Sequence, residues 1–169
     1  TRMMDFFDEQ RMSRLYEKFI LEYYRREHPR LNASASFIDW ALDDGVADGL
    51  PAMRSDITLS ARGRVLIIDA KCYASTMQSN FDKRTVHSGN LYQIFAYVKN
   101  KQVALERSGE SAEVSGMLLY AATDEDIQPD ATYRMSGNRI SATTLDLDRP
   151  FLEIRAQLDG IVEEYFPGE

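Results

Sequence analysis

The stretch RVLIIDAKCYAS, residues 64–75, contains an apolar run that ends in two charges. Residues 65–68 have the length and β-branched content of a strand that is buried on both faces. Asp69 and Lys71 follow, and because side chains alternate along a strand they share one face. Burying two charges is costly unless they pair or bind something. The stretch therefore predicts a buried strand whose end holds a cation or an anion.

A second carboxylate, Asp56, lies upstream in MRSDITLS, where polar and apolar residues alternate as in a strand. The segment between the acids, residues 61–64, is a turn. If it is a four-residue hairpin loop, Ser60 pairs with Val65, and Asp56 lies opposite Asp69. A two-residue loop would shift the pairing by two and keep both acids on one face, and a three-residue loop would separate them. Directly opposed side chains are about 4.5 to 5.5 Å apart at Cβ, which a divalent cation can bridge.

Two segments with helical periodicity flank this hairpin. In SGNLYQIFAYVKNKQVALE, Ser88 is placed to cap the helix, and Gln93 and Tyr97 share one face at i and i+4. In RMSRLYEKFILEYYRREHP, an apolar stripe ends at Pro29. Glu17 lies just outside that stripe, so periodicity alone predicts an exposed side chain. The stripe comprises Met12, Leu15, Tyr16, Phe19, Ile20 and Tyr23.

The remaining segments complete an α/β fold. We expect a first strand over residues 34–40, a buried strand in EVSGMLLYAAT and a hairpin in YRMSGNRISATTLDL. A last helix is expected to begin at residues 148–150, DRP. The order α-β-β-β-α-β-β-β-α predicts a mixed sheet flanked by helices. The apolar face of the last helix would comprise Phe151, Ile154, Leu158, Ile161 and Tyr165.

The two acids and the lysine have the layout of the PD-(D/E)xK nuclease motif, although Ser55 stands where a proline usually precedes the first acid. The glutamine and tyrosine of the following helix resemble the QxxxY motif of RecB-like nucleases. In order, the segments RLYEKFI, SDITL, VLIIDAKCY and LYQIFAYV resemble the C-terminal nuclease domain of the McrC family, over roughly residues 5–125. The combination is much more specific than any single segment.

This resemblance implies a restriction-endonuclease-like core of αβββαβ order, with an added hairpin and C-terminal helix. It also implies a DNA endonuclease that acts with an McrB-like AAA+ GTPase motor in a modification-dependent (type IV) restriction system. Family members carry an N-terminal region that engages the motor, and no segment here corresponds to it. We expect residues 1–169 to be one domain, the C-terminal part of a longer protein.

Three alternatives remain open at this stage. The chain could be a free-standing RecB-like nuclease, or a catalytically silent scaffold of the same fold. It could also be a metal-dependent enzyme that acts on a small acidic substrate. Silent modules typically lose an acid or the lysine, and Asp56, Asp69 and Lys71 are all present.

The resemblance also implies the chemistry of the site. Asp56 and Asp69 would ligate Mg²⁺ together with the Ala70 carbonyl, since hard oxygen ligands suit that ion, and Mn²⁺ would substitute. Glu17, on the first helix, would approach the metal through a bound water. Lys71 would orient the attacking water or stabilise the transition state.

The other residues of the predicted site have supporting roles. Gln93 and Tyr97 would buttress the lysine or contact the nucleic acid. The chain has one cysteine, Cys72, which excludes an internal disulfide and a cysteine-ligated iron–sulfur cluster.

The charge balance argues against a self-sufficient DNA binder. Twenty basic residues against 27 acidic ones give a net charge of −7, whereas DNA-binding domains usually carry a basic excess. Lys83 and Arg84, in the expected loop before the QxxxY helix, are the predicted phosphate contacts, and His87 is close enough to touch substrate. No apolar run approaches the roughly 20 residues of a membrane helix, so we expect a cytoplasmic protein without a membrane partner.

Overall fold

A mixed five-stranded sheet forms the centre of the computed structural model, which describes residues 2–73, 77–80 and 83–169. For residues 2, 77–80 and 83–85 only the backbone is described. The strands lie in the order β3 (Ile57–Ala61), β4 (Arg64–Lys71), β7 (Glu113–Ala121), β9 (Asn138–Leu145) and β8 (Ala131–Met135). β4, β7 and β9 are parallel neighbours, and the two edge strands are antiparallel to them.

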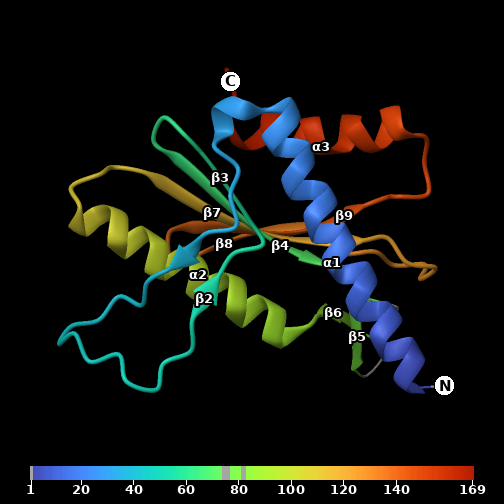
Figure 1. The fold of residues 1–169 in the computed structure, drawn as a ribbon, viewed down its shortest axis with the longest axis horizontal. Coiled ribbons are helices and arrows are strands. Elements are labelled where there is room, and N and C mark those ends of the chain that lie inside the picture. The colour runs from blue at the N-terminus through green and yellow to red at the C-terminus, as the bar shows by residue number, and fades with distance from the viewer. Residues whose placement is uncertain (1, 74–76, 81–82) are drawn as a thin grey trace.

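Helices cover both faces of this sheet (Figure 1). One face packs against α1 (Arg2–Glu27) and α3 (Phe151–Tyr165), and the other packs against α2 (Ser88–Arg107). A 3₁₀ turn, η1 (Pro29–Leu31), follows α1 at the predicted proline stop. Within the described part of the chain, no helix combines the length and apolar character needed to cross a bilayer.

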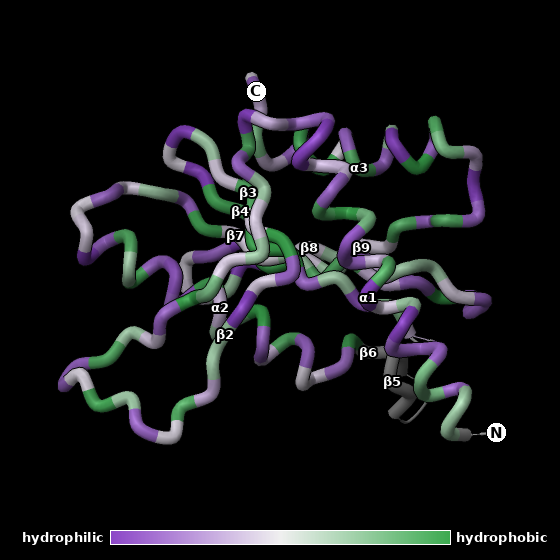
Figure 2. Tube along the Cα trace, in the orientation of Figure 1, coloured by the Kyte–Doolittle hydropathy of each residue, from purple (hydrophilic) through white to green (hydrophobic). Residues whose placement is uncertain are grey.

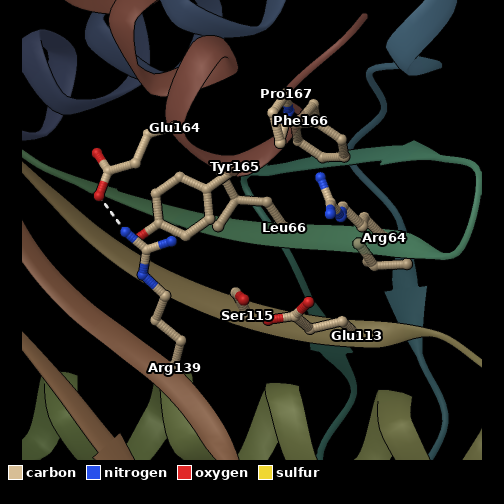
Figure 3. Close-up of a pocket in the computed structure, with 10 residues that line it drawn as sticks. Arg64, Leu66, Glu113, Ser115, Arg139, Glu164, Tyr165, Phe166 and Pro167 are labelled. Atoms are coloured by element: carbon tan, nitrogen blue, oxygen red, sulfur yellow. Dashed lines mark hydrogen bonds and ion pairs between the residues drawn. The ribbon is translucent and has the colours of Figure 1, made fainter.

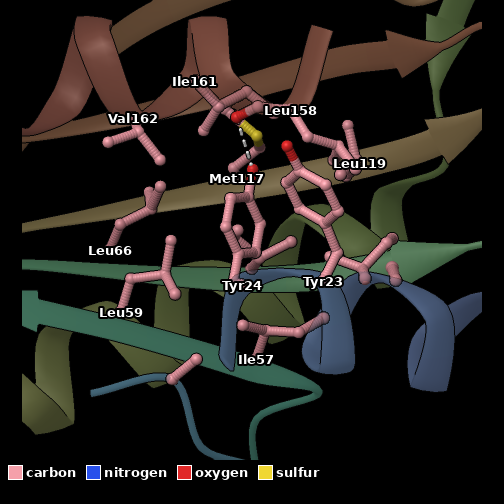
Figure 4. Close-up of a cluster of buried hydrophobic side chains, with 14 of the residues drawn as sticks. Tyr23, Tyr24, Ile57, Leu59, Leu66, Met117, Leu119, Leu158, Ile161 and Val162 are labelled. Carbon is pink, nitrogen blue, oxygen red and sulfur yellow. Dashed lines mark hydrogen bonds between the residues drawn. The ribbon is translucent and has the colours of Figure 1, made fainter. Parts of the chain in front are cut away.

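Burial on both faces explains the sequence of β4. Leu66 and Ile68 pack into the cluster under α1 and α3, whereas Val65 and Ile67 pack into the cluster under α2. The most hydrophobic parts of the trace accordingly converge on β3, β4 and β7 (Figure 2). Figure 4 shows the first cluster, in which Tyr24 and side chains of the sheet and of α3 point toward one another. A continuous apolar run is therefore what this central strand requires.

The β3–β4 hairpin has the register expected for the four-residue loop. Ser60 pairs with Val65, but Ala61 and Arg64 also pair, so the turn itself contains only residues 62 and 63. Both turn residues have positive φ angles, 22° and 75°, as a tight two-residue hairpin turn requires. Asp56 directly precedes β3, and continuing the register by one pair brings it opposite Asp69.

Two expected segments differ in the structure. Only Phe37–Ile38 of residues 34–40 form a strand, β1, which pairs with β2 (Met53–Arg54) in a separate two-stranded sheet. Ser34 makes an isolated bridge to Thr58, after which the chain leaves the edge of the main sheet. The expected loop before α2 contains a second small sheet, β5 (Met77–Asn80) with β6 (Lys83–Val86). The order αβββαβ is therefore realised only in part within the main sheet.

The apolar stripes predicted for α1 and α3 are buried in the middle of each helix and exposed at its N-terminal end. Tyr16, Ile20 and Tyr23 are buried, but Met12 is 53% exposed and Leu15 is 56% exposed. The buried face of α1 instead carries Tyr16 and Ile20, with Ser13 and Glu17 half-buried beside them, and Met12 and Leu15 lie outside it. Phe151 is 57% exposed because it is the first residue of α3 and lies at the end of the helix. The predicted hairpin of β8 and β9 and the last helix are confirmed.

We expect Gly116→Ala to destabilise the fold because α2 lies directly over this position of β7. A Cβ at Gly116 would stand 2.7 Å from Val98 Cγ2 and 2.8 Å from Ile94 Cγ1, which is closer than packed atoms allow. Overpacking of this kind costs about 1–3 kcal/mol of unfolding free energy, measurable by urea denaturation. Gly160→Ala in α3 is the control, since nothing lies within 4 Å of the added Cβ. It should stabilise the protein by up to about 1 kcal/mol, and equal effects of the two changes would contradict this account.

Candidate active site

Two carboxylates meet where β3 begins beside β4. Asp69 is 4% exposed within β4, and Asp56 is half-buried just before β3. Asp56 Oδ2 accepts a hydrogen bond of 2.9 Å from the Ala70 backbone N–H. The N–H and C=O of one strand residue project toward the same neighbouring strand, so the Ala70 carbonyl also projects toward the side of Asp56. The backbone of the sheet thus brings together the three oxygen donors that the sequence predicted.

Burial makes this pair of acids electrostatically unfavourable when both are ionised. The pKa of Asp56 is raised to about 8. The largest cause is desolvation, followed by hydrogen bonding to Asp69, repulsion from Asp69 and repulsion from Glu17. The hydrogen bond from Ala70 opposes this shift, because it stabilises the ionised carboxylate. Without a compensating cation the two acids therefore hold a proton at neutral pH.

Lys71 connects the acids to α2 through a chain of polar contacts. Its Nζ lies 3.1 Å from Asp69 Oδ2 and donates a 3.1 Å hydrogen bond to Gln93 Oε1. Gln93 Nε2 in turn donates to the Tyr97 hydroxyl at 2.9 Å. Burial alone would lower the pKa of Lys71, but attraction to Asp69, together with Tyr73 and Asp56, gives a net rise. The lysine is therefore held in its charged form, beside the residues that the sequence predicted.

Glu17 approaches the same site from α1. It is half-buried rather than exposed, and desolvation followed by repulsion from Asp69 raises the pKa of its carboxyl, whereas Lys71 and Arg14 lower it. The neighbouring Tyr16 donates a 3.1 Å hydrogen bond to the Leu119 carbonyl of β7, which fixes this turn of α1 against the sheet. In the described ranges, no three His, Cys, Asp or Glu side chains gather closely enough to hold an ion together. Glu17 therefore stands near the carboxylate pair without completing a three-acid cluster.

A second polar network, which the sequence analysis missed, lies beside Lys71. The Tyr73 hydroxyl donates to Asn90 Oδ1 at 3.3 Å, and Asn90 Nδ2 donates to the Tyr120 hydroxyl at 3.1 Å. Tyr73 is two residues after Lys71, and Asn90 is three residues before Gln93. Strand periodicity places Tyr73 on the face of Lys71, and helical periodicity places Asn90 on the face of Gln93, so the sequence could have indicated both residues. It could not have indicated Tyr120, which faces Lys71 only through the β4–β7 register.

The predicted nucleic-acid residues lie at the start of α2 and in β6. His87 precedes the first residue of α2, so Ser88 begins the helix rather than capping it. The His87 ring lies 5.6 Å from the Tyr73 ring, and its Nε2 is buried without a hydrogen-bond partner among the residues that the structure describes. Lys83 and Arg84 belong to β6, and their side chains lie outside the described residues, so their contact with phosphates stays a prediction.

The donors at this site fit a hard divalent cation. Asp69 Oδ2 is buried, and across the described residues no donor is aligned with it as a hydrogen bond, although it forms the ion pair with Lys71. A buried carboxylate oxygen without an aligned donor, beside a second carboxylate and a backbone carbonyl, suits Mg²⁺ or Mn²⁺. Zinc would prefer nitrogen and sulfur donors, and none of these belongs to the three-donor group.

A separate pocket lies at the other end of β4, away from the carboxylates. It has a volume of about 150 Å³ and is lined by Arg64 of β4, Ser115 of β7 and the C-terminal end of α3. Figure 3 shows Arg139 paired with Glu164 at its edge and stacked against Tyr165. One of its two arginines is thus paired within the protein, and the pocket, at the far end of β4 from Asp69, is no part of the candidate site.

Comparison with known proteins finds a similar sequence. No family model matches the chain. The chain is 32% identical over 161 residues, 94% of its length, to the "Type IV methyl-directed restriction enzyme EcoKMcrBC" of Escherichia coli strain K12. This similarity supports its assignment to the McrC family. The chain spans 44% of that relative's length, so the McrC-family assignment concerns one part of such a protein.

The pKa of Asp56 predicts how stability depends on pH in the metal-free protein. The folded protein keeps a proton that the unfolded chain, with its ordinary pKa of 3.8, has released. The contribution of this group to stability is therefore fully present below pH 3.8 and is lost as pH rises to about 8. Asp56→Asn should flatten this loss in urea unfolding measured across the window. The exposed Asp48→Asn should keep the wild-type profile, and identical profiles for all three proteins would contradict the assignment.

Proposed function

We propose that the chain is a Mg²⁺-dependent DNA endonuclease subunit of a modification-dependent, McrBC-like restriction system. The observation that carries the proposal is the contact chain Asp69–Lys71–Gln93–Tyr97 beside Asp56. It joins the acid and lysine of a nuclease motif to the glutamine and tyrosine of a helix that follows them in sequence. Similarity to a type IV restriction enzyme supports the same activity.

The fold that we propose for this function is a restriction-endonuclease-like core. The antiparallel β3–β4 hairpin continues through α2 into β7, which is parallel to β4, and α1 packs across the opposite face. This arrangement places the end of the apolar strand β4 between two helices. The hairpin β8–β9 extends the sheet at one edge, and α3 packs beside α1 on one face.

The residues of this chain would divide the hydrolysis among them. Asp56, Asp69 and the Ala70 carbonyl would hold the metal, which when bound lowers the pKa of water and neutralises charge on the phosphate. Lys71, kept charged by Asp69, would stabilise the negative charge that develops on the phosphate or orient the attacking water. Its hydrogen bond to Gln93 fixes its direction, and Glu17 would orient water from the α1 side.

DNA and an AAA+ GTPase motor are the partners that we propose. A net charge of −7 disfavours independent binding to a polyanion, so a second component would raise the local concentration of DNA at the site. Residues 1–169 would then be the C-terminal nuclease domain of a longer McrC-like protein. A free-standing RecB-like nuclease is the second candidate, favoured by the glutamine–tyrosine pair of α2. A silent scaffold is disfavoured because the acids and the lysine are all retained in contact.

Asp69→Asn and Lys71→Ala should each reduce cleavage of supercoiled plasmid by about 10²- to 10⁴-fold, the usual scale for removing a catalytic group. The assay is run with Mg²⁺, with and without the motor and GTP, and circular dichroism verifies the fold. Asp48→Asn and Lys101→Ala change the same residue types outside the site and should cleave as the wild type does. Wild-type rates for either site variant would refute the nuclease assignment, and rapid cutting without a motor would favour the RecB-like alternative.

Addition of Mg²⁺ or Mn²⁺ should raise the thermal midpoint, because the ion binds the folded protein and relieves repulsion between the two acids. Asp56→Ala should remove this shift, whereas Asp48→Asn should retain it. Differential scanning fluorimetry across a metal titration measures both. An unchanged shift in Asp56→Ala would mean that the ions bind elsewhere.

A further inference from the structure

A hollow of about 440 Å³ opens from the candidate site along α1. One wall is the α1 surface that carries Arg14, Glu17 and Lys18, and the other is the segment over residues 54–56, which ends in Asp56. The hollow therefore has one of the two candidate metal ligands at its rim. Its remaining lining residues are Leu21 and Ala35.

Three cations, Arg14, Lys18 and Arg54, border this hollow. Arg14, Lys18 and Arg54 are exposed, and none of them forms an ion pair within the described part of the chain. Elsewhere the arginines of this acidic protein are commonly neutralised, as in the pairs of Arg139 with Glu164 and Arg155 with Glu27. Positive charge without an ion-pair partner thus stands next to the acids, where an anionic ligand would be held.

The orientation of these cations is partly fixed. Arg54 Nε donates a 3.4 Å hydrogen bond to the Ala35 carbonyl, and its guanidinium lies 5.3 Å from the centre of the Phe37 ring. Arg14 and Lys18 are four residues apart on α1, which separates them by about 6 Å along the helix axis. Charges spaced in this way suit successive phosphates of a chain better than one small anion.

Arg14 also borders a second hollow, of about 470 Å³, on its other side. Phe6 and Tyr73 line that hollow, together with Glu9, Gln10 and Ser13. The two hollows follow each other along α1, with Arg14 between them. A ligand that lies along α1 would meet cations on the Asp56 side and aromatic rings on the Tyr73 side.

On the basis of the proposed nuclease function, we propose that the hollow bordered by Arg14, Lys18 and Arg54 binds the DNA backbone on one side of the cleaved phosphate. Lys18 and Arg54 contact the flanking phosphates, and Arg14 contacts the phosphate nearest the carboxylates. DNA binding therefore depends on α1 and β2, in addition to the loop residues before α2 that the sequence indicated. The salt dependence of binding reports these contacts directly, because each neutralised phosphate releases counterions.

The test measures binding of a fluorescent DNA duplex to the 169-residue chain at low ionic strength, with Ca²⁺ replacing Mg²⁺ to prevent cleavage. Arg14→Ala, Lys18→Ala and Arg54→Ala should each reduce the slope of log K against log salt by about 1, and the triple variant by about 3. Lys18→Arg should restore the wild-type slope. Thermal midpoints verify that each variant is folded.

The matched control replaces three cations outside both hollows, by Arg26→Ala, Arg30→Ala and Lys101→Ala, and should leave the slope unchanged. Equal slopes for the two triple variants would overturn the inference, as would absence of binding by the wild-type chain at the lowest salt. Cleavage is measured separately in the assembly with the motor. Failure of the wild type to cleave there would overturn the proposed nuclease, whereas normal cleavage with unchanged slopes would overturn only this inference.

Discussion

The electrostatic conflict between Asp56 and Asp69 is the constraint on which the rest of the site depends. Desolvation and proximity make a doubly ionised pair unfavourable, yet the sheet fixes both acids, one within β4 and the other through the Ala70 N–H. Positive charge must therefore be supplied nearby. Lys71 provides part of it, and the three oxygen donors provide a place for a divalent ion. The contacts of Gln93 and Tyr97 then serve to hold the lysine where it is needed.

Local periodicity was sufficient to predict the centre of this site. The period of two along β4 placed Asp69 and Lys71 on one face of the strand, and the structure shows them in contact. The helical period placed Gln93 and Tyr97 on one face of α2, and they are hydrogen-bonded. The hairpin register could be counted from the turn, although the turn proved shorter than expected.

Features that depend on distant segments were not predictable in the same way. Tyr120 reaches the site only through the parallel register of β4 and β7, which no local pattern encodes. Met12 and Leu15 continue an apolar stripe but are exposed, because α1 turns the face that carries Tyr16, Glu17 and Ile20 toward the sheet. Residues 34–40 alternate like a strand, yet the break at residues 55 and 56 leaves only a short edge to pair with.

Nearly all the side chains of the candidate site lie between residues 14 and 97, and Tyr120 is the exception among those described. Strands β8 and β9 and helix α3 pack against the core, and none of the described side chains of the candidate site comes from them. Changes in the last third of the chain therefore reach the site only through the pairing of β9 with β7 and the packing of α3 against α1. Such changes would alter the stability of the fold before they alter the positions of the carboxylates and the lysine.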